Sequence, residues 1–364
     1  HHAFNDFKVT TAAIFPHRAN YIVAIDGFIG REWLLRQAGG IGKRKFTNDI
    51  QLIRQIRHVL TKQGDILALY PEARYSLVGT NAVLPDSLGK MAKLLGVPIV
   101  MLNMHGNYLN SPAWNLHPRG NRLAADMSLL FSPQELVTSS VAAINKKINK
   151  AFEYDEYTWQ KENNVIINYP KRAEGLHKVL YQCAHCGSEY TMSSFGSTLV
   201  CNNCNKEWKM STLGELSASK MADDESSLHT EFSHIPDWYE NERAFVREEI
   251  KNGTYSVELP VIIDALPNAK KYIRLGKGLL THSPLGFILR ATFEGEPFEL
   301  KKPVESMYSC HIEFEYFGKG DCIDLSTLDD TYYIFPEGHQ FSVTKMALAT
   351  EELFYAAQRK KELI

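Results

Sequence analysis

Six cysteines occur in the 364-residue sequence, and four of them form a pattern that suits a metal ion. Cys183 and Cys186 form one Cys-x-x-Cys pair, and Cys201 and Cys204 form a second pair after fourteen intervening residues. Each pair can present two thiolates on one turn, so two pairs on adjacent hairpins supply the ligands of a closed tetrahedral zinc site. We expect a structural zinc ion. A redox dithiol is the alternative, although it does not need two matched pairs.

The first six residues, HHAFND, place His1 and Asp6 in the pattern His-x-x-x-x-Asp. On a turn that enters a helix, this spacing lets the carboxylate reach the imidazole and fix its tautomer. A histidine held in this way is a competent general base for a hydroxyl group. The pattern alone is not specific, because histidine and aspartate often occur at this spacing. The two leading histidines could also be the remnant of an expression tag, and His2 could act in place of His1.

A second candidate site is the sequence YPEARYS at residues 70–76, which follows the apolar run 66–69. An apolar run that ends in proline, glutamate and arginine is typical of a strand that leads into a loop. Glu72 and Arg74 suit a loop that holds an anionic group. The alternative is an ion pair between these two side chains that only orders the loop. The similar letters FPEG at 335–338 follow a β-rich run and are explained by turn formation.

A basic segment, LLRQAGGIGKRKF at residues 34–46, offers further cations for an anionic ligand. It ends in three adjacent basic residues, which are Lys43, Arg44 and Lys45. Such cations can bind phosphate through charge-assisted hydrogen bonds. Together with REWLLRQ at 31–37, they would also suit anionic lipid headgroups. The alternative is an ordinary solvated surface.

These segments occur in an order that resembles the glycerophospholipid acyltransferase family, specifically the 1-acylglycerol-3-phosphate acyltransferases. The family has four blocks, which are His-x-x-x-x-Asp, a Gly-rich basic segment, Phe-Pro-Glu-Gly-Thr-Arg-Ser and an apolar Val-Pro-Ile-Val strand. In this chain they correspond to residues 1–6, 34–46, 70–76 and GVPIVML at 96–102. The resemblance covers residues 1 to about 115, and its specificity comes from the order of the four blocks.

The third block departs from the family pattern, because glycine, threonine and arginine are replaced by Ala73, Arg74 and Tyr75. Arginine has therefore moved one position earlier. Either the loop is re-angled so that Arg74 still points at the ligand, or phosphate binding falls to residues 43–45. In the fourth block, Met101 replaces the family's second proline.

The resemblance implies an enzyme that moves a fatty acyl group from acyl-CoA or acyl-carrier protein to the free hydroxyl of a lysophospholipid such as 1-acylglycerol-3-phosphate. His1 would remove the hydroxyl proton, and Asp6 would stabilise the imidazolium ion. The phosphate-binding role would fall to Glu72, Arg74, Lys43, Arg44 and Lys45. The alternative function is a non-enzymatic scaffold that binds lipid or protein through a zinc ribbon and a degenerate acyltransferase domain.

Residues 1–165 are expected to form the acyltransferase-type α/β domain that positions these side chains. Apolar runs predict strands at 21–26, 65–71 and 97–104, and apolar side chains at helical spacing predict helices at 48–64, 87–96 and 132–157. Alternating strands and helices favour a largely parallel sheet. Because the chain begins with His1 and not with methionine, we expect the encoded protein to be longer, and a membrane anchor could precede it.

Two further domains are expected after this α/β domain. The zinc ribbon occupies residues 178–213 and is followed by a polar linker at 214–237. Residues 238–364 contain seven strand-like runs separated by turn residues and a final helix at 343–363. This pattern predicts a small β-barrel or sandwich closed by a helix. Such a domain is similar to pleckstrin-homology-like domains, which would imply lipid or protein docking.

The net charge of −2 argues against a protein that is held on nucleic acid by bulk charge. The ribbon segment 178–213 contains three lysines and no arginine, so it also lacks a basic surface. No run approaches the roughly 20 apolar residues that cross a bilayer, and the paired cysteines suit a reducing compartment. We therefore expect a cytoplasmic protein at the inner face of the membrane. Its partners would be acyl-CoA or acyl-carrier protein, a lysophospholipid and the membrane surface, without nucleic acid.

Overall fold

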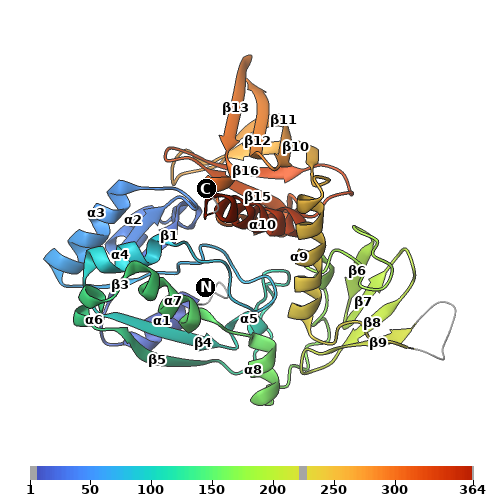
Figure 1. Cartoon of the computed structure of the whole chain (residues 1–364), viewed down its shortest axis with the longest axis horizontal. Coiled ribbons are helices and arrows are strands. Elements are labelled where there is room, and N and C mark those ends of the chain that lie inside the picture. Colours follow the sequence, from blue (N-terminus) through green and yellow to red (C-terminus); the bar gives the residue numbers. More distant parts are fainter. Residues whose placement is uncertain (1–5, 221–227, 363–364) are drawn as a thin grey trace.

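The computed structural model describes residues 6–220 and 228–362, with the side chains of residues 220, 361 and 362 excluded. Figure 1 shows a mixed α/β molecule with an N-terminal α/β region, a small β-rich ribbon and a C-terminal sheet that lies above two long helices. The mixed α/β class predicted from the sequence is therefore confirmed. Among the described residues, no helix is both long enough and apolar enough to span a membrane.

The N-terminal region begins with helix α1 (Asp6–Ile14), which is followed by a three-stranded parallel sheet. Its strands lie in the order β2 (Gly40–Lys43), β1 (Ala19–Ala24) and β3 (Ile66–Ala68). Parallel neighbours need crossover connections, and these contain η1 (Ile25–Phe28), α2 (Glu32–Gln37), α3 (Ile50–His58) and the π-helical turn η2 (Val59–Gln63). The side chain of Asp49 caps α3, and Gly64 ends the helical segment with a φ of 72°.

The prediction of a largely parallel sheet was wrong beyond these three strands. Helix α4 (Ser87–Leu95) leads to β4 (Ile99–His105), which pairs antiparallel with β5 (Ala124–Phe131) and not with the parallel sheet. The short helix α5 (Asn107–Asn110) lies between these two strands in sequence. Most of β5 is exposed, so its sequence lacks the apolar alternation that marks a half-buried strand.

The single helix predicted at 132–157 is divided into three helices, α6 (Pro133–Thr138), α7 (Val141–Phe152) and α8 (Glu156–Glu162). Each helix begins with its own cap, since the side chains of Ser132, Ser140 and Asp155 all accept hydrogen bonds from amides of the following turn. Ser132 and Glu135 form a full capping box. The three cap residues have extended backbone conformations, so the helix cannot continue through them. A new helix begins directly after each of them.

The ribbon forms a four-stranded antiparallel sheet after the short helix η3 (Leu176–Lys178). Its strands, in sequence and in space, are β6 (Met192–Phe195), β7 (Thr198–Cys201), β8 (Glu207–Met210) and β9 (Leu216–Lys220). Strand β9 lies in the segment that was expected to be a linker. Trp208 of β8 packs on Trp238 with their ring centroids 5.0 Å apart, which attaches the ribbon to helix α9 (Ile235–Lys251).

The C-terminal region contains the seven strands and the closing helix that the sequence predicts. The strands are β10 (Val257–Ala265), β11 (Ile273–Ser283), β12 (Gly286–Phe293), β13 (Glu296–Lys302), β14 (His311–Glu313), β15 (Cys322–Ser326) and β16 (Thr331–Pro336). Two short helices, η5 (Val304–Ser306) and η6 (Tyr316–Gly318), connect some of them, and α10 (Val343–Glu362) closes the chain.

The expected barrel is wrong, because all seven strands form one open antiparallel sheet in the order β13-β12-β11-β10-β16-β15-β14. A single sheet is also not the sandwich that was the other expected form. The first and last strands of the region pair at the centre of the sheet. The remaining strands therefore extend outward on both sides, and the two edges, β13 and β14, do not meet within the described residues. Helices α9 and α10 lie side by side below this sheet (Figure 1).

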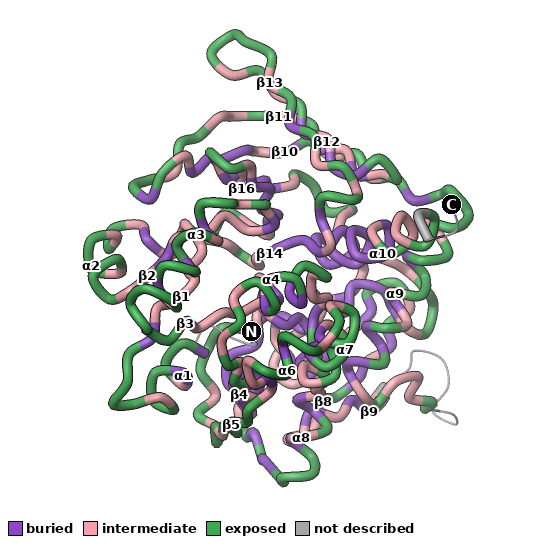
Figure 2. Tube along the Cα trace, turned by 60° about the vertical axis from the view of Figure 1, so that its left-hand side comes forward, coloured by how far each residue is buried: buried purple, intermediate pink, exposed green. Residues whose placement is uncertain are grey.

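One hydrophobic core connects the three regions. It contains Tyr108 from the N-terminal region, Trp208 from the ribbon and Ile334 from the C-terminal sheet, all of which are fully buried. In Figure 2 the buried segments are concentrated along α9, α10 and β14, whereas β13 and α2 are largely exposed. Edge strand β14 thus lies in the interior of the molecule, where it faces the N-terminal region.

Candidate functional site

A large cavity of about 1100 Å³ lies between the N-terminal α/β region and strand β14. Its wall is predominantly apolar and includes Ile14, Ile22, Leu52, Ile53, Ile56, Leu69, Leu88 and Met91. The cavity is also lined by the charged side chains of Arg18, Asp26, Arg31, Lys43, Lys45, Asp49, Arg74, Lys90 and Glu313. An apolar cavity with a few convergent charged groups is the usual form of a small-molecule site.

Asp6 lies at the start of α1 and is only 1% exposed. Its Oδ1 accepts a hydrogen bond of 2.8 Å from Nδ2 of Asn107, which begins α5. In the next turn of α1, Thr10 Oγ1 lies 2.8 Å from the hydroxyl oxygen of Tyr70. These two contacts connect the start of the chain with the loop at 70–76 and with the segment after β4. The predicted base, His1, and its alternative, His2, lie outside the described residues.

The loop at 70–76 is held by its own side chains. Glu72 is 1% exposed, and its Oε1 accepts a hydrogen bond of 2.6 Å from the amide of Ala82. The hydroxyl of Ser76 donates to the carbonyl of Thr80 at 2.7 Å. Ala73 has a φ of 57°, which is the left-handed conformation that glycine adopts most easily. The position where the family pattern has glycine is therefore one where the backbone requires left-handed geometry.

Arg74 lines the cavity but is engaged with the C-terminal helix. It is 5% exposed, and its Nη2 lies 2.7 Å from Oε1 of Glu351 on α10. Glu351 also accepts hydrogen bonds from the hydroxyl of Ser309 at 2.7 Å and from Nη1 of Arg243 at 2.8 Å. The Nε and Nη1 atoms of Arg74 are buried and have no hydrogen-bond partner among the described residues. The N–H groups on these two nitrogens thus bind no described residue of the chain.

The three adjacent cations at 43–45 have different environments. Arg44 donates to the carbonyls of Leu266 at 2.9 Å and Pro267 at 2.8 Å, so it attaches β2 to the C-terminal sheet. Lys45 forms an ion pair of 3.1 Å with Asp324. Lys43 lines the cavity, and among the described residues it has no salt bridge or side-chain hydrogen bond. Burial lowers the pKa of Lys43.

The buried pair of Arg74 and Glu351 is expected to stabilise the fold. Arg74→Met keeps an unbranched apolar stem but leaves Glu351 with Arg243 as its cation, and breaking a buried ion pair in this way costs about 3 kcal/mol or more. The expected result is a lower free energy of unfolding in urea titrations. Arg290→Met is the matched control, because Arg290 and Glu299 form an exposed pair whose loss costs about 0–1 kcal/mol.

The effect of Arg74→Met should depend on pH. Burial by itself raises the pKa of Glu351, but Arg74 and Arg243 more than offset it, so the pKa in the folded protein is below the ordinary value of 4.5. The stabilisation is therefore complete above 4.5 and is lost as the pH falls through the folded-state pKa. The difference between wild type and variant should accordingly shrink in acid. An unchanged unfolding midpoint in the variant would contradict the stabilising role of this ion pair.

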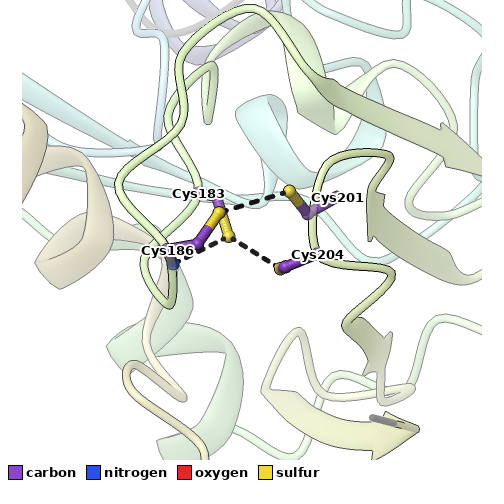
Figure 3. Close-up of side chains that lie close together, drawn as sticks. All are labelled: Cys183, Cys186, Cys201 and Cys204. Atoms are coloured by element: carbon purple, nitrogen blue, oxygen red, sulfur yellow. Dashed lines mark hydrogen bonds between the residues drawn. The ribbon is translucent and has the colours of Figure 1, made fainter. Parts of the chain in front are cut away.

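The four paired cysteines lie together at one end of the ribbon (Figure 3). Their Sγ atoms are all within 4.8 Å of one another, with 3.8 Å between Cys183 and Cys204 and 3.7 Å between Cys186 and Cys201. Four sulfur atoms at 2.3 Å from a tetrahedral zinc ion would be about 3.8 Å apart. The amide of Cys186 also points at Cys183 Sγ at 3.5 Å, as in a thiolate knuckle. This cluster could hold a metal ion.

Sequence reasoning missed the cavity residues that the C-terminal region contributes, which are Tyr308, His311 and Glu313. No local pattern connects them with residues 6–76. The only available signal was the spacing of His311 and Glu313, since residues two apart on a strand share one face. It also missed the partner of His105, because Asp126 lies on the unpredicted strand β5, 2.9 Å from the imidazole Nε2.

No protein-family model, curated protein or solved structure matches the chain.

Proposed function

We propose that the chain is an acyltransferase that moves a fatty acyl group from acyl-CoA or acyl-carrier protein to the free hydroxyl of a lysophospholipid. The observation that supports this function best is the convergence of three of the four sequence blocks. The start of α1, the basic residue Lys43 and the loop at 70–76 are distant in sequence. They meet at or beside one large apolar cavity.

The cavity suits an acyl chain. Its wall is built from aliphatic side chains of β1, α3 and α4, and each methylene group that it buries contributes about 0.8 kcal/mol to binding. Ile50 and Leu94 line the cavity and are more than half exposed, so the cavity opens to the surface between α3 and α4. Trp33 and Leu34 of α2 are also exposed, beside the cationic Arg31. Aromatic and aliphatic side chains next to a cation suit an anionic membrane surface.

The proposed reaction needs one general base and no acyl-enzyme intermediate. His1 removes the proton of the acceptor hydroxyl as the oxygen attacks the thioester carbonyl carbon. The C–S bond then breaks, and the thiolate takes the proton from His1 as it leaves. Asp6 carries the negative charge that stabilises the imidazolium ion, and Asn107 holds the carboxylate in place through its hydrogen bond to Oδ1.

Lys43 is the cation that we assign to an anionic group of the substrate, because it lines the cavity and forms no ion pair with any described residue. Lys43→Met should raise the KM for a phosphate-bearing substrate about tenfold and leave kcat nearly unchanged, since it removes a binding contact and not a catalytic one. The measurement is steady-state acyl transfer at fixed acyl-CoA. Lys62→Met is the control, because Lys62 is an exposed lysine of η2 away from the cavity. Equal effects of the two changes would contradict this role for Lys43.

We also propose that the four paired cysteines hold one structural zinc ion. Four protein thiolates complete a tetrahedral shell, so no position remains for a substrate or a water molecule. The site lies in the ribbon, none of whose cysteines lines the cavity. The metal would therefore support the fold and take no part in acyl transfer.

The experiment that tests the acyltransferase function is a transfer assay with labelled acyl-CoA, using the full chain. We expect acylated product from lysophospholipids but not from the corresponding diacyl lipids, which lack a free hydroxyl. Binding of lysophospholipid without any transfer, from either acyl-CoA or acyl-carrier protein, would favour the alternative function of a non-enzymatic lipid-binding scaffold.

A further inference from the structure

The inner end of the cavity is closed by the C-terminal sheet, and its polar groups fit a particular headgroup. We propose that this end, formed by Asp26, Lys45, His311 and Glu313, binds the ammonium group of a zwitterionic lysophospholipid, in which a phosphodiester lies next to a primary amine. The inference rests on the proposed function, which places the acyl chain of the lysophospholipid in the apolar part of the cavity. It names a lysophospholipid with a zwitterionic headgroup, and not one with a phosphate monoester, as the preferred acyl acceptor.

His311 on β14 is the central residue of this polar end. It is 2% exposed and lines the cavity, and its Nε2 lies 2.9 Å from Oε1 of Glu313. A carboxylate partner requires the proton to be on Nε2, so in the neutral ring Nδ1 presents a lone pair. Nδ1 is buried and has no hydrogen-bond partner among the described residues. A buried acceptor without a donor costs free energy, and a ligand N–H group would satisfy it.

Two carboxylates near His311 also have an unused oxygen. Asp26 lines the cavity, and its Oδ1 is buried without a hydrogen-bond partner among the described residues, while Oδ2 accepts from the hydroxyl of Tyr316 at 3.3 Å. Oδ2 of Asp324 accepts a hydrogen bond from Lys45, and its Oδ1 is likewise buried without a partner in the described part of the chain. The two atoms on the cavity wall that have no partner among the described residues, Asp26 Oδ1 and His311 Nδ1, are thus both acceptors.

The charges at this end favour a cation. Asp26, Glu313 and Asp324 are three carboxylates, and among the described residues Lys45 is the only lysine or arginine that forms an ion pair with any of them. The three carboxylates act on Lys45 together, because their charges more than offset the effect of burial and raise its pKa. A ligand ammonium group brings both a positive charge and three N–H donors, which matches the excess of negative charge and the unpaired acceptors.

The same cavity also contains cationic hydrogen-bond donors without a partner among the described residues. The headgroup should therefore carry a negative phosphodiester as well as a positive ammonium group. The Nε and Nη1 atoms of Arg74 and the ammonium group of Lys43 are not paired by the described residues, and both side chains line the cavity. A phosphodiester accepts from such groups, whereas its neighbouring amine donates to the carboxylates. A phosphate monoester would leave the acceptors at the polar end without a donor.

The test compares three lysolipids that have the same short acyl chain and are used below their critical micelle concentrations. They are 1-acylglycerophosphoethanolamine, 1-acylglycerophosphoglycerol and 1-acylglycerophosphate, and calorimetry measures their binding to the full chain without an acyl donor. We expect the ethanolamine lipid to bind about 10- to 100-fold more tightly than the phosphoglycerol lipid, which is the range for charge-assisted hydrogen bonds. Equal affinities for these two lipids, or tightest binding of the monoester, would overturn the inference.

Two variants locate the effect. Asp26→Asn and Glu313→Gln should each reduce the preference for the ethanolamine lipid to less than threefold and leave the affinity for the phosphoglycerol lipid unchanged. Glu296→Gln, an exposed position on edge strand β13, should keep the full preference. If both site variants keep the full preference for the ethanolamine lipid, this lipid does not bind at Asp26 and Glu313. The comparison of the three lipids on the wild-type protein decides the ligand class even if one variant does not fold. Failure of all three lipids to bind would overturn the proposed function as well.

Discussion

Removing the metal from the cysteine cluster is expected to unfold the ribbon and much of the core attached to it. A structural zinc site contributes about 10–16 kcal/mol of binding free energy to folding in zinc-finger peptides. The structure connects the site to the core directly, because Trp208 follows the second cysteine pair, is fully buried and packs on Trp238 of α9. Metal analysis should find one zinc ion per chain, and a chelator should produce a large change in tryptophan fluorescence.

The matched comparison uses cysteines of similar burial. Cys201→Ser removes a buried ligand and should abolish stoichiometric zinc binding, whereas Cys310→Ala changes a buried cysteine outside the cluster and should retain it. The loss of zinc in the first variant should be accompanied by a lower melting temperature than in the second. Recovery of metal-free protein with native fluorescence would contradict the structural role of the cluster.

The helical segments that end at a glycine could be predicted from the sequence, and the strand pairing could not. The helical segment formed by α3 and η2 ends at Gly64, and α4 ends at Gly96. Both glycines adopt positive φ, so local chemistry was sufficient to locate these ends. Strand β4 was also located, but its partner β5 was not, because five consecutive residues of β5 are exposed and give no apolar alternation. Strand pairing depends on contacts between distant residues that no local pattern contains.

The same limit applies to the candidate site. The convergence of Asp6, Lys43 and the loop at 70–76 was predicted from the order of the blocks, because each block carries its own residue types. The partners of Arg74 and Arg44 were not predictable, since Glu351 and Leu266 come from the C-terminal region, more than 200 residues away in sequence. His311 and Glu313 were missed for the same reason. Three polar residues of the cavity wall, Tyr308, His311 and Glu313, therefore come from a domain whose sequence suggested only docking.

Replacing Asp6 with asparagine is expected to lower kcat for acyl transfer by about 10²- to 10⁴-fold, which is the usual contribution of general-base catalysis. The amide of asparagine has the size of the carboxylate, and its oxygen can still accept the hydrogen bond from Asn107 Nδ2. The change therefore removes mainly the negative charge that stabilises a protonated histidine during proton transfer. Steady-state kinetics with acyl-CoA and a lysophospholipid measure the loss, and KM values should change little because Asp6 lies outside the cavity wall.

Two controls separate a loss of catalysis from a loss of structure. The melting temperature of Asp6→Asn should stay close to that of wild type, because the variant replaces a buried charge by a neutral group of the same shape. Glu337→Gln tests the similar FPEG segment, where Glu337 is exposed in the turn after β16, and it should leave kcat unchanged. If Asp6→Asn retains full turnover, the active centre is not at the start of α1. The cavity pair of His311 and Glu313 would then be the next histidine and carboxylate to test as the base.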